Sequence, residues 1–326
     1  VPGQDTKELA TMDQERITEV AAWAQEAFQE LETLNIPVVL ALNGLALGGG
    51  NELVAAAHYV VAPNIPRVYV GQPEIYINLI PGFGGTQRLI RLMADRSKDG
   101  QEAGLLFAAD TVLTGQPMTM EEAHRHGLIS ELVSSNELAR AYQLAIGHAL
   151  GTDPTLQRAM EERHETIKRW EQPLIDRKSG QPIAATVLTD DPYIRHYVEH
   201  AAQVGLRKDA AQTILDLLVA NITHPFGVRF GDEAYHFGRL ATGAPAKAAM
   251  LRFLQRRPLP RPMHRPFVVQ SSLDGGEEIA KRSPGDPGLS PEESEAIDSL
   301  IARKIAEGKS ALLDEPLHAQ IVKILE

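Results

Sequence analysis

The hydrophobic positions at the start of the chain follow the period of a helix and then that of a buried strand. Over residues 12–34 the apolar side chains recur at steps of three and four, as Ile17, Val20, Ala21, Ala24, Phe28 and Leu31. This spacing places them on one side, so we expect a helix with one buried face. Asn35 and Pro37 end that helix, and the Val and Leu run over residues 37–42 predicts a buried strand.

Strands, glycine-rich turns and helices then alternate up to about residue 150. Three consecutive glycines, residues 48–50, precede an apolar helix expected over 51–57, and a second strand is expected over 59–62. Residues 71–85 are dense in Gly and Pro, and helical spacing resumes at 87–93. Beyond these we expect a helix, a strand and a further helix, over 119–126, 129–133 and 136–150. The alternation predicts an α/β fold.

The pattern changes beyond residue 151. Residues 152–170 and 190–222 are polar and helix-forming, with little indication of strands. Four prolines over 256–266 predict an extended linker, and Ser290 opens a helix-capping sequence, Ser-Pro-Glu-Glu. We therefore expect three regions, an α/β core, a helical C-terminal region and a linker with a terminal helix, over residues 1–150, 151–262 and 263–326.

Composition and charge narrow the class of protein. The chain has 326 residues, 43% of them apolar and 23% charged, which is typical of a globular protein. Its net charge of −11 disfavours general nucleic-acid binding, and the absence of Cys excludes disulfides, Cys-based zinc sites and thiol nucleophiles. Apolar runs are too short and too interrupted by glycine to span a membrane, and no signal peptide opens the chain. We expect a soluble protein of the cytoplasm or of an organelle matrix.

The segment Asn43–Leu53 (NGLALGGGNEL) carries the densest chemical signal. Glycines between a buried strand and a helix let a ligand approach the backbone and meet free N–H groups. The helix dipole adds positive potential at the same point, which suits an anionic oxygen, and Glu52 lies one turn inside. Such a turn also serves tight packing alone, and this segment by itself leaves both interpretations open.

A second segment, Gly71–Leu89 (GQPEIYINLIPGFGGTQRL), places Glu74 after a proline in an apolar context. A carboxylate there costs free energy to bury unless some interaction uses it. Taken alone, Glu74 is more often a hydrogen-bonded core carboxylate than a functional one. Glu52 and Glu74 are 22 residues apart, so they can meet only if the chain turns back, which the strand expected over 59–62 permits.

Taken together, the two segments resemble the signature of the enoyl-CoA hydratase/isomerase superfamily, the crotonases. That signature pairs an NG-x-A-x-GGG-x-EL turn with a GQPE…IPG-x-GGTQRL turn, and both stand in this chain. Residues 113–115 and 127–129 match the family's LTG and GLV stretches, and residues 1–9 resemble its first oxyanion loop. The resemblance covers residues 1 to about 150. Residues 229–254 are similar to the end of the hydratase part of multifunctional fatty-acid oxidation proteins.

The resemblance implies an α/β fold of the crotonase type, a spiral of ββα units that is N-terminally truncated here, followed by a helical C-terminal region. It implies an acyl-CoA substrate that brings its own coenzyme A, so no separate cofactor is expected, and it places Lys7 against that coenzyme A. It also implies assembly as a homotrimer or a hexamer.

The same resemblance implies roles for individual residues. The backbone N–H groups of Gln4 and Gly49 would bind the thioester oxygen, and Glu52 and Glu74 would hold a water, one as base and the other as acid. Gly82 matches the position whose N–H helps to fix that water. Pure isomerases resemble this pattern with only the second acid, so both glutamates favour an enoyl-CoA hydratase. An isomerase, an acyl-CoA hydrolase or a non-catalytic binding protein of the same fold are the alternatives.

Four histidines could suggest a metal, but their pattern does not. His196 and His200 are spaced one helical turn apart without a third ligand or an HExxH motif. His124 and His126 lie at the end of an expected helix. We interpret all four as surface histidines and expect no metal site.

Two further expectations concern a pair of arginines and the charged segment that follows them. Arg88 and Arg91 could meet the phosphates of coenzyme A, although arginines at helical spacing more often form surface ion pairs. Residues 94–104 are charged and are expected to form a connection longer than the one usual in the family.

Overall fold

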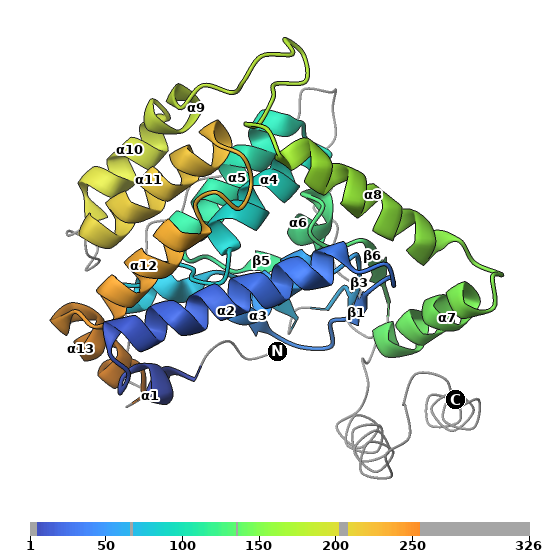
Figure 1. Cartoon of the computed structure of the whole chain (residues 1–326), viewed down its shortest axis with the longest axis horizontal. Helices are drawn as coiled ribbons and strands as arrows, with labels where there is room; N and C mark the ends of the chain where they lie inside the picture. The colour runs from blue at the N-terminus through green and yellow to red at the C-terminus, as the bar shows by residue number, and fades with distance from the viewer. Residues whose placement is uncertain (1–4, 66–67, 135, 202–207, 255–326) are drawn as a thin grey trace, which may run out of the picture.

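The computed structural model describes residues 5–65, 68–134, 136–201 and 208–254 (Figure 1). The oxyanion residue Gln4 and the region 263–326 with its terminal helix lie outside these residues. The helices of the first half are α1 (Thr6–Leu9), α2 (Gln14–Thr33), α3 (Gly49–Ala56), the 3₁₀ helix η1 (Pro73–Ile77), α4 (Gly85–Arg96), α5 (Gln101–Thr114), α6 (Met120–Arg125) and α7 (Glu137–Ala149). Those of the second half are α8 (Thr155–Trp170), α9 (Thr186–Thr189), α10 (Pro192–Glu199), α11 (Lys208–Thr223), α12 (Phe230–Ala241) and α13 (Ala244–Leu254).

The described strands form two small sheets. They are β1 (Val39–Ala41), β2 (Ala46–Leu47), β3 (Tyr59–Pro63), β4 (Tyr69–Gly71), β5 (Met118–Thr119) and β6 (Glu131–Val133). In one sheet the order is β1-β3-β6 and all strands are parallel, with Leu40 opposite Val60 and Ala62 opposite Leu132. In the other the order is β2-β4-β5, with β4 and β5 antiparallel. Parallel neighbours need crossover connections, and α3 supplies the one between β1 and β3.

The long helix α2 forms where the apolar spacing predicts it. Asp13 caps its N-terminus by accepting the N–H of Arg16, and Ile17, Ala21 and Ala24 form its buried face. Helix α12, from late in the chain, packs along α2 (Figure 1). One cluster of buried apolar side chains runs from Leu9 to Met250, so the late helices share a core with the α/β part.

The connection expected over residues 94–104 is wrong. Helix α4 continues to Arg96 and α5 begins at Gln101, which leaves a turn of four residues between them. The two helices pack closely because Gly104 faces α4, where a Cβ atom would overlap the carbonyl oxygen of Met93. Helix α5 is buried on most sides from Gly104 onward, so it lacks the polar face by which a helix is recognised in a sequence.

Arg88 and Arg91 are buried, which corrects the expectation of surface ion pairs or phosphate contacts. Both lie on α4 between α2 and α11, with at most 1% of their surface exposed. Arg88 Nε donates to Glu32 Oε2 at 2.9 Å. Arg91 donates to the carbonyl oxygens of Asn221 and Gln172, and burial lowers its pKa to about 10.

The expectation of a surface position is wrong for His126 too. Its ring stacks on Phe107 with 3.9 Å between centroids, only 6% of it is exposed, and burial lowers its pKa. His196 is exposed and stacks on the half-exposed His200, and His124 is half-exposed, as expected for residues near the surface.

Candidate active site

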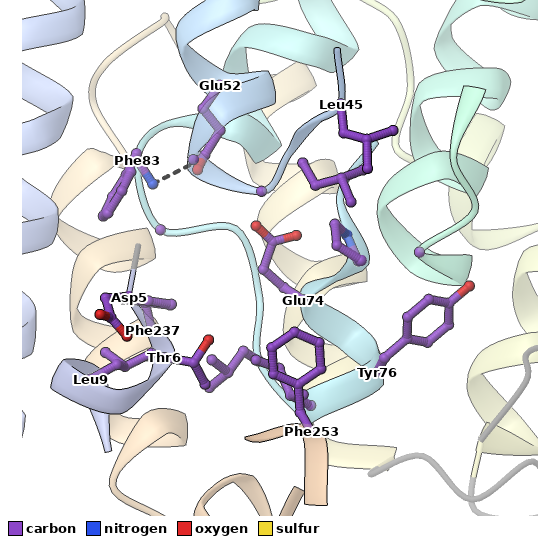
Figure 2. Close-up of a pocket in the computed structure, with 18 of the residues that line it drawn as sticks. Asp5, Thr6, Leu9, Leu45, Glu52, Glu74, Tyr76, Phe83, Phe237 and Phe253 are labelled. Atoms are coloured by element: carbon purple, nitrogen blue, oxygen red, sulfur yellow. Dashed lines mark hydrogen bonds between the residues drawn. The ribbon is translucent and has the colours of Figure 1, made fainter. Parts of the chain in front are cut away.

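A cavity of about 960 Å³ opens where the two glycine turns, the N-terminal helix α1 and the late helices α12 and α13 meet (Figure 2). The residues that line it include Leu9, Leu45, Gly49, Glu52, Glu74, Tyr76, Gly82, Phe83, Phe237 and Phe253. Most of this lining is apolar, with a few polar groups directed inward, as in pockets that hold small molecules. Four of the residues singled out in the sequence, Gly49, Glu52, Glu74 and Gly82, therefore reach one cavity.

Glu52 enters the cavity from the first turn of α3. The chain turns into this helix at Gly48, whose φ of 57° lies in the left-handed region that favours glycine. Glu52 is 1% exposed, and its Oε1 accepts the N–H groups of Phe83 at 2.8 Å and Gly85 at 2.7 Å. A Cβ atom on Gly85 would lie 2.7 Å from Oε1, so only glycine permits this approach. Burial, and then the nearby Glu74 carboxylate, raise the pKa of Glu52 well above its usual range.

Glu74 lies on η1, half-buried at the edge of the cavity. In the amide orientation that satisfies both of its atoms, buried Gln72 donates through Nε2 to the two carboxylate oxygens of Glu74 at 3.1 Å. A Cβ atom on Gly48 would lie 2.7 Å from Glu74 Oε1, so the first glycine turn makes room for this side chain. Desolvation raises the pKa of Glu74 to about 8.

The two carboxyl groups point toward one another across the cavity (Figure 2). Two like charges held together in a desolvated site do not both ionise readily, so the pair retains a proton at neutral pH. The two N–H donors on Glu52 Oε1 favour its charged form and so oppose the larger effect of burial on its pKa. One member can then act as a base and the other as an acid.

The remaining predicted residues are placed as follows. Gly49 is the first residue of α3, so its N–H has no partner within the helix, and the residue lines the cavity. Gly82 lines the cavity and accepts a hydrogen bond from Gln25 Nε2 through its carbonyl oxygen. Lys7 is exposed on α1, a helix that borders the cavity. Gln4 lies outside the described residues.

Sequence reasoning missed a third acid, Glu233 of α12. It is fully buried and accepts hydrogen bonds from the N–H groups of Gly84 and Thr86, the Thr86 hydroxyl and Gln25 Nε2. In the sequence, Glu233 stands in the first turn of a helix, where an acidic residue is ordinary. Its partners lie about 150 residues or more away, and no local pattern indicates them.

Comparison with known families identifies the family of the chain. Residues 2–176 match the model of the enoyl-CoA hydratase/isomerase family. The chain belongs to this family. Membership confirms the resemblance drawn from the two glycine turns, and with it the crotonase-type α/β fold followed by a helical C-terminal region.

Curated relatives are larger proteins of fatty-acid oxidation. The chain is 28% identical over 292 residues to the fatty acid oxidation complex subunit alpha of Shewanella loihica, covering 85% of this chain and 37% of that protein. It is 33% identical over 207 residues to the peroxisomal fatty acid beta-oxidation multifunctional protein AIM1 of Arabidopsis thaliana, covering 60% and 27%. The chain thus spans well under half the length of these relatives.

Some of the solved structures with detectable similarity carry enoyl-CoA hydratase descriptions. An enoyl-CoA hydratase from Bacillus anthracis is 28% identical with a TM-score of 0.35, covering 51% of this chain and 67% of that one. An enoyl-CoA hydratase/isomerase from Mycobacterium paratuberculosis is 17% identical with a TM-score of 0.45, covering 77% and 74%.

Two searches of the described residues gave nothing. No helix among them combines the length and the hydrophobicity needed to cross a membrane. Nor do three or more His, Asp or Glu side chains gather there in a way that could hold a metal ion.

Proposed function

We propose that the protein adds water across the 2,3 double bond of a trans-2-enoyl-CoA. The observation that carries this proposal is the pair Glu52 and Glu74, two carboxyl groups that face each other in one cavity beside the N-terminus of α3. Membership of the enoyl-CoA hydratase/isomerase family supports an acyl-CoA thioester as the substrate class. A pair of acids is what hydration needs, because one proton leaves the water and one must reach the substrate.

In the proposed reaction, a water lies between the two glutamates and its oxygen attacks C3 of the substrate. Glu52 accepts a proton from this water, and Glu74 donates its own proton to C2, so that the elements of water are added across the double bond. Glu52 suits the role of base because two backbone N–H groups stabilise its charge. Glu74 suits the role of acid because desolvation raises its pKa to about 8. Proton exchange between the pair and solvent restores the starting state.

The backbone stabilises the charge that develops on the thioester oxygen. The free N–H of Gly49 and the positive end of the α3 dipole would meet this oxygen, with Gln4 as the second donor that the family resemblance implies. One such donor contributes about 3–4 kcal/mol to transition-state stabilisation in comparable sites. We further propose that Gly82 helps to hold the water and that Lys7 contacts coenzyme A at the entrance.

The apolar part of the cavity suits the acyl chain. Leu9, Leu45, Tyr76 and Phe253 contribute to its wall, and Phe253 lies on the side of Glu74 away from Glu52 (Figure 2). An apolar wall favours a fatty acyl group and keeps bulk water away from the two acids.

The test follows the absorbance of the conjugated thioester with purified protein and a series of trans-2-enoyl-CoA substrates. We expect the absorbance to fall and 3-hydroxyacyl-CoA to form. A shift of the double bond without added water would identify an isomerase, and release of free coenzyme A a hydrolase. Binding of the thioester without turnover, in protein that carries all the segments of the family fold, would leave a binding protein and end the hydratase proposal.

We also propose that the protein assembles as a homotrimer or hexamer, as the family resemblance implies. Light scattering at micromolar concentration measures the mass directly. A monomer of 35.6 kDa would contradict this proposal.

A further inference from the structure

A third carboxylate, Glu233, shares the second glycine turn with Glu52. The turn and the start of α4 present four consecutive backbone N–H groups, those of residues 83–86. The first and third, Phe83 and Gly85, donate to Glu52. The second and fourth, Gly84 and Thr86, donate to Glu233. Alternate peptide units of one turn are thus held by two carboxylates that lie far apart in the sequence.

Glu233 takes the place of the capping side chain that α4 lacks. The residue before α4 is Gly84, with a φ of 96° and no side chain to accept the first N–H groups. Glu233 accepts two of them and also the hydroxyl of Thr86. Gln25 of α2 links it to the rest of the turn, since its Nε2 donates both to Glu233 at 3.2 Å and to the carbonyl of Gly82 at 2.9 Å. All five residues from Gly82 to Thr86 are therefore held by Glu52, Glu233 or Gln25.

We propose that Glu233 is a positioning residue for Glu52. By fixing the peptide units of Gly84 and Thr86, it sets the direction of the N–H of Gly85 between them and of Phe83 beside them, the two groups that hold the Glu52 carboxylate. It acts through the backbone and does not reach the cavity wall, which distinguishes it from Glu52 and Glu74. The consequence for catalysis rests on the proposed hydratase function, whereas the effect on the turn does not.

The charge of Glu233 acts on the same pair. Burial raises the pKa of Glu52 and of Glu74 most strongly, and Glu233 raises both further. Arg88 faces Glu233 from α4 with the opposite charge, and burial raises the pKa of Glu233 itself. Removal of the Glu233 charge therefore shifts the titration of the pair toward lower pH.

Residue-resolved hydrogen exchange on Glu233→Gln tests the positioning without any assay of activity. We expect faster exchange at all four N–H groups of residues 83–86, by about tenfold if roughly 1.4 kcal/mol of local stability is lost. The backbone N–H groups of Phe83 and Gly85 distinguish positioning of Glu52 from local helix capping, because they donate to Glu52 and not to Glu233. Faster exchange at Gly84 and Thr86 alone would make Glu233 a local helix cap and overturn the proposal. This readout stands even if the protein hydrates nothing.

Kinetics of the same variant test the catalytic consequence. We expect kcat to fall by roughly 10–100-fold with KM little changed, because substrate contacts remain and only the base is misplaced. In the pH dependence of kcat, the limb that reports the titration of Glu52 and Glu74 should move to lower pH. In Glu233→Asp the charge remains but the side chain is shorter, so the pH profile should return toward normal while kcat stays low. Normal kcat and an unchanged pH profile in Glu233→Gln would overturn the proposal.

Two further variants separate this effect from general destabilisation. Asp95→Asn, at the other end of α4, removes the carboxylate that accepts Trp170 Nε1 at 2.7 Å and pairs with Arg177. It should lower the melting temperature without changing kcat or exchange at residues 83–86. If Glu233→Gln does not fold, Thr86→Val removes the hydroxyl that donates to Glu233 and that also accepts Asn221 Nδ2 at 3.0 Å. It should give smaller changes of the same sign, and unchanged exchange and kcat in a folded Thr86→Val would overturn the proposal.

Discussion

Buried carboxylates occupy two neighbouring regions of this molecule, and their charges are balanced in different ways. Glu32 on α2 lies between two arginines, with Arg88 Nε at 2.9 Å and Arg163 at 3.6 Å. Glu52, Glu74 and Glu233 lie close to one another in a desolvated region where backbone N–H groups hold Glu52 and Glu233, and their pKa values are raised although Arg88 is also near Glu233. Glu32 and its arginines hold helices together, whereas burial beside other carboxylates favours the protonated form in the second group. Burial alone therefore does not mark a candidate functional acid, whereas burial among other acids does.

The largest effect is expected from Glu74→Gln and Glu52→Gln. Each variant keeps the volume of the side chain but cannot exchange a proton, so the hydration rate should fall by about 10²–10⁴-fold while the protein stays folded. The double variant should lose far less than the product of the single losses, because both groups act on one water. Hydration rates measured beside melting temperatures check this. A near-normal rate in either folded single variant would remove that glutamate from the mechanism.

Glu32→Gln should lower the stability of the protein strongly and its hydration rate only slightly, the reverse of what is expected for Glu74→Gln. It leaves Arg88 and Arg163 without their buried counter-charge, and loss of one partner of a buried ion pair costs about 3–5 kcal/mol. Denaturant unfolding measures the loss of stability, and the hydration rate per folded molecule should change much less than in Glu74→Gln. Unchanged stability, or a rate as low as that of Glu74→Gln, would show that the two regions do not differ in this way.

Glu74 should also make stability depend on pH. The pKa of Glu74 rises from the ordinary 4.5 to about 8 in the folded protein. Between these values the unfolded chain releases a proton that the folded one keeps, so this group lowers the free energy of unfolding as pH rises. Melting temperatures at pH 5 and pH 8 should fall less steeply in Glu74→Gln than in the wild type. An identical slope would mean that Glu74 titrates normally.

The smallest effect is expected where an ion pair is exposed. Lys168 and Glu165 on α8 are 2.6 Å apart with more than 60% of each side chain exposed. Lys168→Ala should leave the melting temperature unchanged within error, because water screens such pairs. A loss comparable with that of Glu32→Gln would contradict the view that burial distinguishes the Glu32 pair.

The sequence predicts the helices, strands and acids whose signals are local. The spacing on α2 marks a half-buried helix, and the glycine turns beside Glu52 and Glu74 mark places where backbone N–H groups are exposed. Helix α5 escapes prediction because most of its residues are buried and leave no polar face.

Residues whose roles depend on partners far away in the sequence are not predicted either. Arg88 looks like a surface residue until α2 supplies Glu32. Glu233 looks like an ordinary first-turn acid until the fold brings it to residues 84 and 86. The assignment of Glu52 and Glu74 to a shared water remains a prediction from the family resemblance, now with a geometry that suits it.

The long separation in sequence between Glu233 and residues 83–86 has a consequence for folding. A ribosome makes residues 83–86 well before α12, and until α12 docks on α2 the start of α4 lacks the carboxylate that caps it. Contacts between residues so far apart in the sequence form slowly, because bringing them together costs conformational entropy of the intervening chain. On refolding, helix content should therefore recover before hydration does, and a fragment that ends before α12 should be helical and inactive.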